Sequence, residues 1–331
     1  MKIVFFGTRK EEKPLIKMWA EKYEYKAEIR TDFLTEENAC EVKGYDAVCI
    51  VVNCRITETA AKALAASGIK YILTRAAGTD HLDVEAIHRY GIRSANVPVY
   101  SPNAVSEHTI LLTLAVLRHL KEQINRTAKH DFTIAGIQGR ELGNMTVGVI
   151  GTGRIGCATI RILNGFGSRL LAYDKREKEE MKQLVTYAGL TELTRTSDII
   201  IFHCPVTKEN YHMADAGFLQ NCKDGVVLVN CARGELLDGG AVLEAVKSGK
   251  VGALAIDVFE NEQEYLRKDK SGDGMQDKVL EELIGRPEVI YTPHTAFYTG
   301  EAIANMVETS FRNLYEYETT GRCKNETEEE K

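Results

Sequence analysis

Two series of short apolar runs constrain the fold of this chain more than any other feature of its sequence. The runs of the first series span residues 2–7, 25–30, 46–52, 70–75 and 92–97. Between them, the segments 14–23, 57–68 and 83–91 carry apolar residues at helical spacing. Strands that alternate with helices predict a parallel sheet covered on both faces. We therefore expect an α/β domain within the first ~95 residues.

A leucine-rich segment, residues 101–130, follows this first series. Its spacing predicts one long helix, with Ser101 as the N-cap and Pro102 in the first turn. The middle of the segment is too apolar for a helix face in water, so we expect it to be buried between domains or subunits.

The second series begins at Asn144 and predicts another α/β domain. Its apolar runs span residues 145–151, 169–174, 198–204, 225–231, 253–259 and 288–294. Residues 299–318 then form a last amphipathic pattern, which predicts a C-terminal helix.

Length and composition exclude several classes of protein. The 331 residues are enough for two domains. A net charge of -6 argues against nucleic acid or an anionic membrane as a partner. No apolar run approaches the ~20 residues of a membrane-spanning helix. The eight cysteines form no C-x-x-C pair, so we expect free, mostly buried thiols and a cytoplasmic location.

A glycine fingerprint, GVIGTGRIG, opens the second series. Gly151, Gly153 and Gly156 follow a strand and precede a helix, which is the context of a dinucleotide-binding turn. Asp174 ends the next strand, where a carboxylate accepts hydrogen bonds from the adenosine ribose and repels a 2′-phosphate. The pattern favours NAD over NADP, although Lys175 and Arg176 follow at once and weaken the preference. The alternative is an ordinary strand–helix turn that binds nothing.

Four polar residues stand at or just after the ends of later strands: Arg233, Asp257, Glu262 and His294. The carboxyl ends of parallel strands meet at one edge of a sheet, so these side chains can converge on one cleft. A guanidinium binds a carboxylate and polarises a neighbouring carbonyl, and an imidazole exchanges a hydroxyl proton. A carboxylate beside that imidazole orients it and favours its charged form. This set fits hydride transfer to or from a hydroxy acid.

Taken together, these motifs resemble the D-isomer-specific 2-hydroxyacid dehydrogenases over essentially the whole chain, most closely the D-lactate dehydrogenase branch. The residues that carry the resemblance are GTGRIG, DIIIFHCP, VNCARGELLD, IDVFENE and TPHTAFYT. The resemblance implies that Arg233 binds substrate, that His294 is the acid/base, and that Glu262 is its partner. Asp257 would meet the nicotinamide carboxamide.

The resemblance also implies further binding residues. Those expected to bind NAD are Gly151, Gly153, Arg154, Ile155, Gly156, Asp174, Cys204, Pro205, Asn210, Cys231, Ala232, Arg233 and Asp257. Those expected to bind substrate are Ala77, Gly78, Tyr100, Arg233 and Phe297. The amides of Ala77 and Gly78 would hold the substrate carboxylate, while Tyr100 and Phe297 would shape the pocket.

For the domain organisation, the resemblance implies two Rossmann-like or flavodoxin-like α/β domains with parallel sheets, the cofactor domain being inserted into a discontinuous substrate domain. Residues 1–100 and 299–331 would form the substrate domain and 101–298 the NAD-binding domain. The helix after Tyr100 would be the hinge and the dimerisation element, and a homodimer is expected.

Substrate choice is interpreted from one departure within the family. The related (R)-2-hydroxyglutarate dehydrogenases carry an arginine near the end of the third strand, where this chain has Val51. A pocket lined by Val51, Val52, Tyr100 and Phe297 suits a small alkyl group, so pyruvate is the expected substrate. Arg55, four residues further on, can nevertheless take the place of that arginine. The alternatives are a 2-hydroxyisocaproate or (R)-2-hydroxyglutarate dehydrogenase, and an NAD-sensing binding protein on the same fold.

The remaining histidines have no partners at metal-ligand spacing, so we expect no metal. His203 ends a strand beside the cofactor and should support the backbone there. The others are interpreted as surface or packing residues: His81, His88, His108, His119, His130 and His212.

Overall fold

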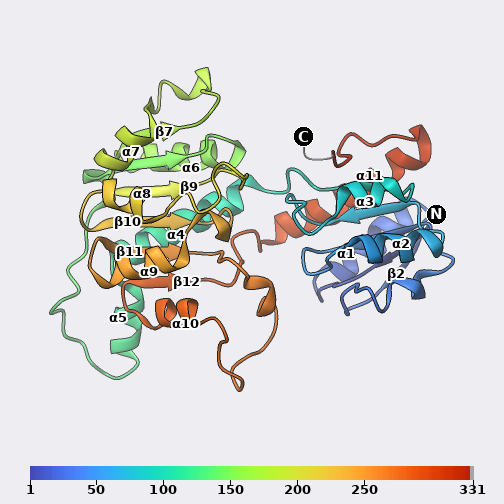
Figure 1. The fold of residues 1–331 in the computed structure, drawn as a ribbon, viewed down its shortest axis with the longest axis horizontal. Coiled ribbons are helices and arrows are strands. Elements are labelled where there is room, and N and C mark those ends of the chain that lie inside the picture. The colour runs from blue at the N-terminus through green and yellow to red at the C-terminus, as the bar shows by residue number, and fades with distance from the viewer. Residues whose placement is uncertain (329–331) are drawn as a thin grey trace. The chain divides into compact units, whose positions relative to one another are not determined.

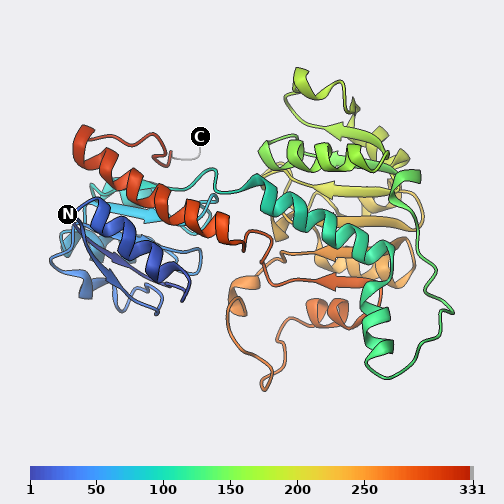
Figure 2. The same cartoon turned by 180° about the vertical axis from the view of Figure 1, so that it is seen from behind.

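The computed structural model describes residues 1–328 and divides into two compact units (Figures 1 and 2). One unit consists of Met1–Ser101 together with residues 298–328 and is called the outer unit, because it contains the outer parts of the sequence. The other, Pro102–Phe297, is called the central unit, because it is the middle part of the sequence. Each unit is built on one parallel sheet, which confirms the α/β fold class.

The sheet of the outer unit has five parallel strands in the order β2-β1-β3-β4-β5. They are β1 (Lys2–Phe5), β2 (Lys26–Ile29), β3 (Ala47–Ile50), β4 (Tyr71–Thr74) and β5 (Arg93–Ala95). Its helices are α1 (Glu12–Lys22), η1 (Ala39–Val42), α2 (Glu58–Ala66), α3 (Val84–Arg89) and α11 (Gly300–Thr320).

Alternate residues of β1, together with Phe6, which directly follows it, enter two different cores. Ile3 and Phe5 pack with α1 and α11, where the Phe5 and Phe311 rings lie 5.3 Å apart. Val4 and Phe6 pack with α2 and α3 on the opposite face. Because successive strand residues point to opposite faces, an almost continuous apolar run is what a sheet covered on both sides requires.

A buried ion pair fixes the carboxyl ends of three strands of the outer unit. Arg75, which follows β4, donates from Nε to Glu12 at 2.9 Å. Its other nitrogens donate to the carbonyls of Phe6 at 2.8 Å and Cys49 at 3.1 Å. Removing one partner of such a pair leaves an uncompensated buried charge and costs about 3–5 kcal/mol. The loop Ala76–Asp80 therefore starts from a rigid base.

The sheet of the central unit has seven parallel strands in the order β12-β11-β10-β9-β6-β7-β8. They are β6 (Thr146–Ile150), β7 (Arg169–Tyr173), β8 (Thr186–Tyr187), β9 (Ile199–Phe202), β10 (Val226–Asn230), β11 (Val251–Ile256) and β12 (Val289–Tyr291). The short edge strand β8 lies outside the six apolar runs predicted from the sequence, because two residues carry no periodic signal.

Helices cover both faces of this sheet. They are α4 (Pro102–Leu117), α5 (Leu120–Thr127), η2 (Leu142–Asn144), α6 (Arg154–Gly165), η3 (Glu179–Met181), α7 (Leu190–Thr196), α8 (Ala216–Asn221), η4 (Gly234–Leu236), α9 (Gly239–Lys247), η5 (Glu262–Glu264) and α10 (Lys278–Gly285). In Figure 2 the teal α4 and the green α6 lie in front of the sheet. Helices α7 to α10 pack into the core on the other face.

The prediction of one long helix over residues 101–130 is wrong. The chain leaves the helical conformation at His119, whose φ is +52°, and α5 begins at Leu120. The last buried residue of α4 is Leu117, and α5 has no buried residue. The turn also brings Lys121 Nζ within 2.6 Å of the carbonyl oxygens of Ile284 and Arg286. Tertiary contacts of this kind override a continuous helical pattern.

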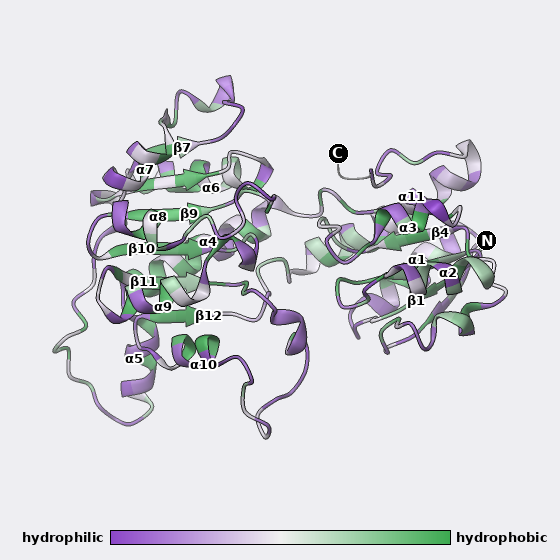
Figure 3. Ribbon diagram, in the orientation of Figure 1, coloured by the Kyte–Doolittle hydropathy of each residue, from purple (hydrophilic) through white to green (hydrophobic). Residues whose placement is uncertain are grey.

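Figure 3 shows that the strands of both sheets are the most hydrophobic part of the chain, while connecting loops are hydrophilic. Within residues 1–328, no helix is both long and apolar enough to span a bilayer.

Candidate active site

Loops at one edge of the central sheet carry most of the predicted site residues of this unit. Strands β6, β7 and β8 extend the sheet in one direction, and β9 to β12 extend it in the other. Strand order thus reverses between β6 and β9. In an open parallel sheet, the crevice at the carboxyl ends of such a pair of strands is where ligands bind.

The glycine fingerprint crosses this reversal point. Gly151 has φ +99°, and a Cβ placed there would lie 2.7 Å from Cys204 N and from His203 O. A Cβ on Gly156 would lie 1.9 Å from the carbonyl oxygen of Gly151. Both glycines are therefore required by packing within the protein, because any side chain would collide with backbone.

Gly153 differs from the other two glycines. Its φ of −63° suits any residue, and a Cβ built there meets no atom within 4 Å. Gly153 is the N-cap of α6, whose first backbone N–H groups face an exposed turn with Arg154 exposed and Ile155 half-buried. A helix N-terminus of this kind stabilises a pyrophosphate. The open space beside Gly153 fits that group, so the turn meets the requirement for a dinucleotide.

Asp174 follows β7 and is held against the same turn. Its Oδ2 accepts from Thr152 N at 2.6 Å and Thr152 Oγ1 at 3.0 Å, and its Oδ1 accepts from Arg176 N at 2.9 Å. Burial tends to raise the pKa of Asp174, but the hydrogen bonds from Arg176 and Thr152 outweigh it and hold the pKa low. Lys175 pairs with Glu209. The carboxylate stays charged and can accept a hydrogen bond from a ribose hydroxyl.

The loop after β9 contains three more predicted cofactor residues. Asn210 Nδ2 donates to the carbonyl of Pro205 at 2.8 Å and contacts Cys204 Sγ at 3.8 Å. Burial raises the pKa of the Cys204 thiol to about 11. His203 Nε2 lies 2.8 Å from Thr159 Oγ1, and burial lowers the pKa of His203 to about 3. Both groups are neutral, so they shape the backbone of the loop and supply no charge.

Arg233 is positioned by an asparagine that ends β10. Asn230 Oδ1 accepts from Ala232 N at 2.9 Å, and Asn230 Nδ2 donates to Arg233 O at 2.8 Å. The thiol of Cys231 is buried, and burial, followed by the charge of Asp257, raises its pKa to about 12. The amide of Asn230 thus folds the loop that carries Arg233.

The next glycine joins this loop to the segment that carries Glu262. A Cβ on Gly234 would lie 2.1 Å from the carbonyl carbon of Phe259 and 2.3 Å from Glu260 N. The two loops therefore touch through backbone, and the residues after β10 and β11 are held together.

Asp257, directly after β11, organises the loop that contains the predicted catalytic histidine. Its Oδ1 accepts from Thr292 Oγ1 at 2.5 Å and Thr295 N at 2.9 Å, and its Oδ2 accepts from Ala296 N at 2.8 Å. The carboxylate is 1% exposed. Burial tends to raise the pKa of Asp257, but the hydrogen bonds, with that of His108 foremost, hold it low.

Glu262 and His294 meet at the end of this network. His294 Nδ1 lies 2.6 Å from Glu262 Oε1, while Glu262 Oε2 accepts from Phe259 N at 3.0 Å. His294 has φ +52°, a left-handed conformation that costs about 1–3 kcal/mol in a residue other than glycine. Its amide donates to the carbonyls of Asp257 at 2.8 Å and Thr292 at 2.9 Å. The surrounding loop imposes the strain and thereby orients the ring.

The contact between His294 and Glu262 also fixes the tautomer. A carboxylate can only accept, so Nδ1 of His294 carries a proton. The other nitrogen, Nε2, is then the atom that can give or take a proton at a substrate. Phe297 packs edge-on against the same ring, with centroids 6.2 Å apart.

The predicted substrate residues Ala77, Gly78 and Tyr100 belong to the outer unit. Ala77 is exposed and Gly78 half-buried in the loop after β4, and Asn96 Nδ2 donates to the Ala77 carbonyl at 2.6 Å. The Tyr100 carbonyl accepts from Asn305 Nδ2 at 2.6 Å. The loop thus lies at the carboxyl end of the outer sheet.

The expectation that Val51 lines a pocket is wrong. Val51 is 1% exposed and packs in the core of the outer unit. A Cβ on Gly7 would lie 2.5 Å from its Cγ2, so the side chain fills the space that this glycine leaves. Val52 is half-buried and Arg55 is exposed. Strand β3 ends at Ile50, before the end of the predicted run, but the side chain of Val51 still packs in the core.

Sequence reasoning missed two residues that build the site. The sequence offers only weak evidence for Asn230, which is a polar residue near the end of an otherwise apolar run. His108, interpreted as a packing or surface residue, lies 3.0 Å from Thr292 Oγ1 and 3.4 Å from Asp257 Oδ1. Its only signal was its place among buried neighbours on α4.

Comparisons with known proteins relate the whole chain to one family. Residues 110–296 match the family model described as D-isomer specific 2-hydroxyacid dehydrogenase, NAD binding domain. The chain is 41% identical over 327 residues to an aromatic 2-oxoacid reductase of Clostridium sporogenes, covering 98% of this chain and 99% of that protein.

It is also 38% identical over 327 residues to the D-lactate dehydrogenase of Escherichia coli, with the same coverage. Among solved structures, it is similar to a D-lactate dehydrogenase of Treponema pallidum, with a TM-score of 0.89 and 34% identity over 99% of this chain and 100% of that one.

Proposed function

Because this chain belongs to the family of D-isomer-specific 2-hydroxyacid dehydrogenases, NAD-dependent oxidoreductases that act on a CH–OH group, we propose that it reduces pyruvate to D-lactate with NADH. The observation that carries this proposal is the Glu262–His294 contact of 2.6 Å, within the same unit as the glycine fingerprint. Such a pair is suited to move one proton at a carbonyl oxygen.

In this reaction His294 is the general acid. NADH, when bound, supplies the hydride to the carbonyl carbon of the 2-oxoacid. The proton on His294 Nε2 passes to the carbonyl oxygen, which becomes the hydroxyl of the product. Glu262 favours the charged imidazole before the transfer and keeps the ring oriented through Nδ1. In the direction of oxidation, the neutral ring accepts the hydroxyl proton.

Substrate is held by its carboxylate. Arg233 presents a planar guanidinium that pairs with a carboxylate through two hydrogen bonds and polarises the carbonyl beside it. From the family resemblance, we infer that Ala77 and Gly78 bind the substrate carboxylate through their amides. Tyr100 and Phe297 are inferred in the same way to contact the side chain of the substrate.

The cofactor residues have the following roles. The N-terminus of α6 at Gly153 and Arg154 holds the pyrophosphate, and Asp174 accepts from the adenosine ribose. The remaining residues line the dinucleotide: Gly151, Ile155, Gly156, Cys204, Pro205, Asn210, Cys231, Ala232 and Arg233. Asp257 keeps lone-pair capacity on Oδ2 for the nicotinamide carboxamide.

A second candidate is a reductase of larger 2-oxoacids. The relative at 41% identity is an aromatic 2-oxoacid reductase, which favours this alternative. The burial of Val51 also bears on the choice of substrate, because a side chain in the core does not limit the size of the substrate pocket. Size selection then depends on half-buried residues such as Val52 and Phe297.

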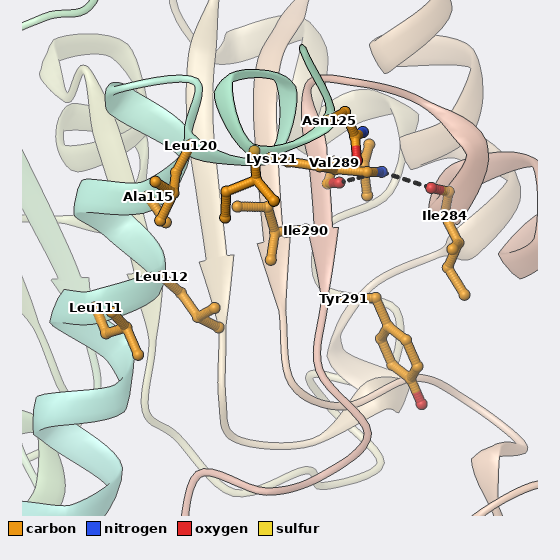
Figure 4. Close-up of a pocket in the computed structure, with 11 residues that line it drawn as sticks. Leu111, Leu112, Ala115, Leu120, Lys121, Asn125, Ile284, Val289, Ile290 and Tyr291 are labelled. Carbon is orange, nitrogen blue, oxygen red and sulfur yellow. Dashed lines mark hydrogen bonds between the residues drawn. The ribbon is translucent and has the colours of Figure 1, made fainter. Parts of the chain in front are cut away.

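We also propose that the enzyme is a cytoplasmic homodimer that assembles through α4 and α5. An apolar groove of about 420 Å³ in the central unit is lined by α4, α5, α10 and β12 (Figure 4). Leu111 and Ile124 lie on it and are 55% and 58% exposed. Figure 4 shows Lys121 Nζ reaching across to backbone carbonyls near β12.

The occupant that suits this groove is a second copy of the same surface. The loop after α5 presents Phe132 and Ile134, which are 76% and 83% exposed. Arg126 fixes this loop to α5 by donating to the Ala135 carbonyl at 2.8 Å. A two-fold interface uses the same self-complementary surface on both subunits, and a groove beside α5 with exposed apolar residues in the loop that follows α5 suits such an interface. The groove contains none of Arg233, Glu262 and His294.

The proposed function is tested by steady-state oxidation of NADH with a panel of 2-oxoacids. The panel contains pyruvate, 2-oxoisocaproate, phenylpyruvate and 2-oxoglutarate, and the chirality of each product is determined. The proposal expects pyruvate to give the highest kcat/KM and D-lactate to be the product. A higher kcat/KM with phenylpyruvate would establish the second candidate. If the protein binds NADH but turns over no member of the panel, the result would support an NAD-sensing binding protein instead of an enzyme.

A further inference from the structure

His108 on α4 contacts the network that holds the catalytic loop. Its Nε2 lies 3.0 Å from Thr292 Oγ1 and 3.4 Å from Asp257 Oδ1. Its side chain is 17% exposed, so the ring is largely shielded from water. The contact comes from a helix distant in sequence from residues 257–296, and it belongs wholly to the central unit.

The number of protons available decides which atom donates. The Thr292 hydroxyl has one proton, and it donates this proton in a hydrogen bond of 2.5 Å to Asp257 Oδ1, because a carboxylate can only accept. Thr292 Oγ1 can then only accept from His108. Nε2 of His108 must therefore carry a proton, whichever charge the ring has. The result is a directed chain from His108 through Thr292 to Asp257.

Asp257 in turn fixes the backbone on both sides of His294. It accepts from the amides of Thr295 and Ala296, and its own carbonyl accepts from the His294 amide. These bonds hold His294 in its left-handed conformation, with Nδ1 directed at Glu262. Any group that restrains Asp257 and Thr292 therefore restrains the geometry between His294 and Glu262.

We propose that His108 is a positioning residue for hydride transfer: through Thr292 and Asp257 it maintains the contact between His294 and Glu262. The inference rests on the proposed role of His294 as the acid. His108 itself does not touch the reacting atoms. Its required property is a hydrogen-bond donor at the position of Nε2, and its ability to titrate is not needed.

The ionisable groups near this network are few. Glu262 faces His294 from η5, and Asp257 faces His108 and Thr292 from the end of β11. Tyr291 precedes Thr292 on β12, and burial, followed by the charges of Glu262 and Asp257, raises the pKa of its phenol far above the assay range. Burial also raises the pKa of the Cys231 thiol, which interacts with Asp257, and of the Tyr265 phenol, which interacts with Glu262, to about 12. A change in the pH profile near neutrality can thus be assigned to the His294–Glu262 pair.

The test compares His108→Phe, which keeps a ring and removes the donor, with His108→Gln, which keeps a donor and cannot titrate. Thr292→Val removes the acceptor hydroxyl without changing the shape. Glu107→Gln, on the exposed side of the same helix, is the matched control. For each variant, kcat and KM for pyruvate reduction are measured against pH, together with the NADH dissociation constant and the thermal midpoint.

The proposal expects His108→Phe and Thr292→Val each to lower kcat about tenfold, with the alkaline limb moved to lower pH and NADH affinity within about twofold of the wild type. The double variant should be no worse than either single one, because both remove the same link. His108→Gln and Glu107→Gln should overlay the wild type. If His108→Phe does not fold, Thr292→Val carries the same expectation.

A His108→Phe or Thr292→Val profile that overlays the wild type would overturn the proposal, and so would a His108→Gln enzyme as impaired as His108→Phe. NMR titration of the His294 ring gives a readout that does not require turnover. Its midpoint should fall in His108→Phe and not in His108→Gln. A wild type that reduces no 2-oxoacid would refute the proposed function, whereas this titration would still decide the role of His108.

Discussion

Asp174 Oδ2 accepts from the backbone N–H of Thr152 at 2.6 Å, so the carboxylate that is proposed to bind the adenosine ribose also holds the glycine turn in place. Replacing Asp174 with alanine removes the ribose contact, the repulsion of a 2′-phosphate and this link together. We expect NADH efficiency to fall and the NADPH-to-NADH ratio of kcat/KM to rise about tenfold or more.

Asp174→Asn separates these effects, because the amide oxygen still accepts from Thr152 while the charge is lost. The ratio should rise in this variant too, with less loss of thermal stability than in Asp174→Ala. A wild type that uses NADPH as well as NADH would show that Asp174 does not discriminate between the cofactors.

The three fingerprint glycines should respond differently to alanine. In Gly156→Ala the new methyl group would lie 1.9 Å from the Gly151 carbonyl oxygen, so the thermal midpoint should fall by about 5 °C or more. In Gly153→Ala the methyl group meets no protein atom, so the midpoint should change by no more than about 2 °C. NADH affinity should nevertheless drop about tenfold, since the methyl group occupies the space for the pyrophosphate. Unchanged NADH affinity in Gly153→Ala would place the pyrophosphate elsewhere.

The sheets of both units could be predicted from the sequence because all their strands except β8 lie in short apolar runs that alternate with helical segments. The break at His119 could not, since it depends on Lys121 meeting carbonyls more than 160 residues away in the chain. The same holds for Val51. Val51 directly follows the last residue of β3, where a side chain can either enter the core or line a pocket. The packing of Val51 against Gly7, which the sequence does not reveal, places it in the core.

The burial of Val51 leads to a prediction about charge at this position. Val51→Arg places an uncompensated charge in the core of the outer unit and should destabilise the protein by about 3–5 kcal/mol. Val52→Arg, at the half-buried neighbour, should cost much less. Thermal unfolding of both variants checks this. If Val51→Arg were as stable as the wild type and gained activity with 2-oxoglutarate, Val51 would be a pocket residue after all.

The groove beside α5 leads to a prediction about assembly. Leu111→Glu and Ile124→Glu place a carboxylate on an apolar surface that a second copy would cover, so each should dissociate the dimer. Met18→Glu, at a residue that is 50% exposed on α1, is the matched control and should not. Sedimentation equilibrium distinguishes these outcomes. A monomeric wild type, or dimers in both groove variants, would exclude this face as the interface.

The sequence points to the side chains that are proposed to take part in the reaction, but not to those that support them. Arg233, Glu262 and His294 stand at strand ends, in a context that few other roles require. Asn230 and His108 act only through the loops that they hold, so their sequence context is that of an ordinary buried residue.

The central claim is that Glu262 and His294 act as one proton-transferring unit, and the pH dependence of pyruvate reduction tests it most directly. Reduction consumes the protonated imidazole, so the rate should hold near neutrality and decline on the alkaline side, while lactate oxidation shows the opposite slope. His294→Ala should lose that limb and about 10²–10⁴-fold of the rate.

The decisive measurement is the pH profile of kcat for Glu262→Gln, which keeps the shape of the side chain and removes its charge. Without the carboxylate the charged imidazole is less favoured, so the alkaline limb should move to lower pH while the protein still folds and binds NADH. A Glu262→Gln profile that overlays the wild type would contradict the account and remove Glu262 from the proton transfer.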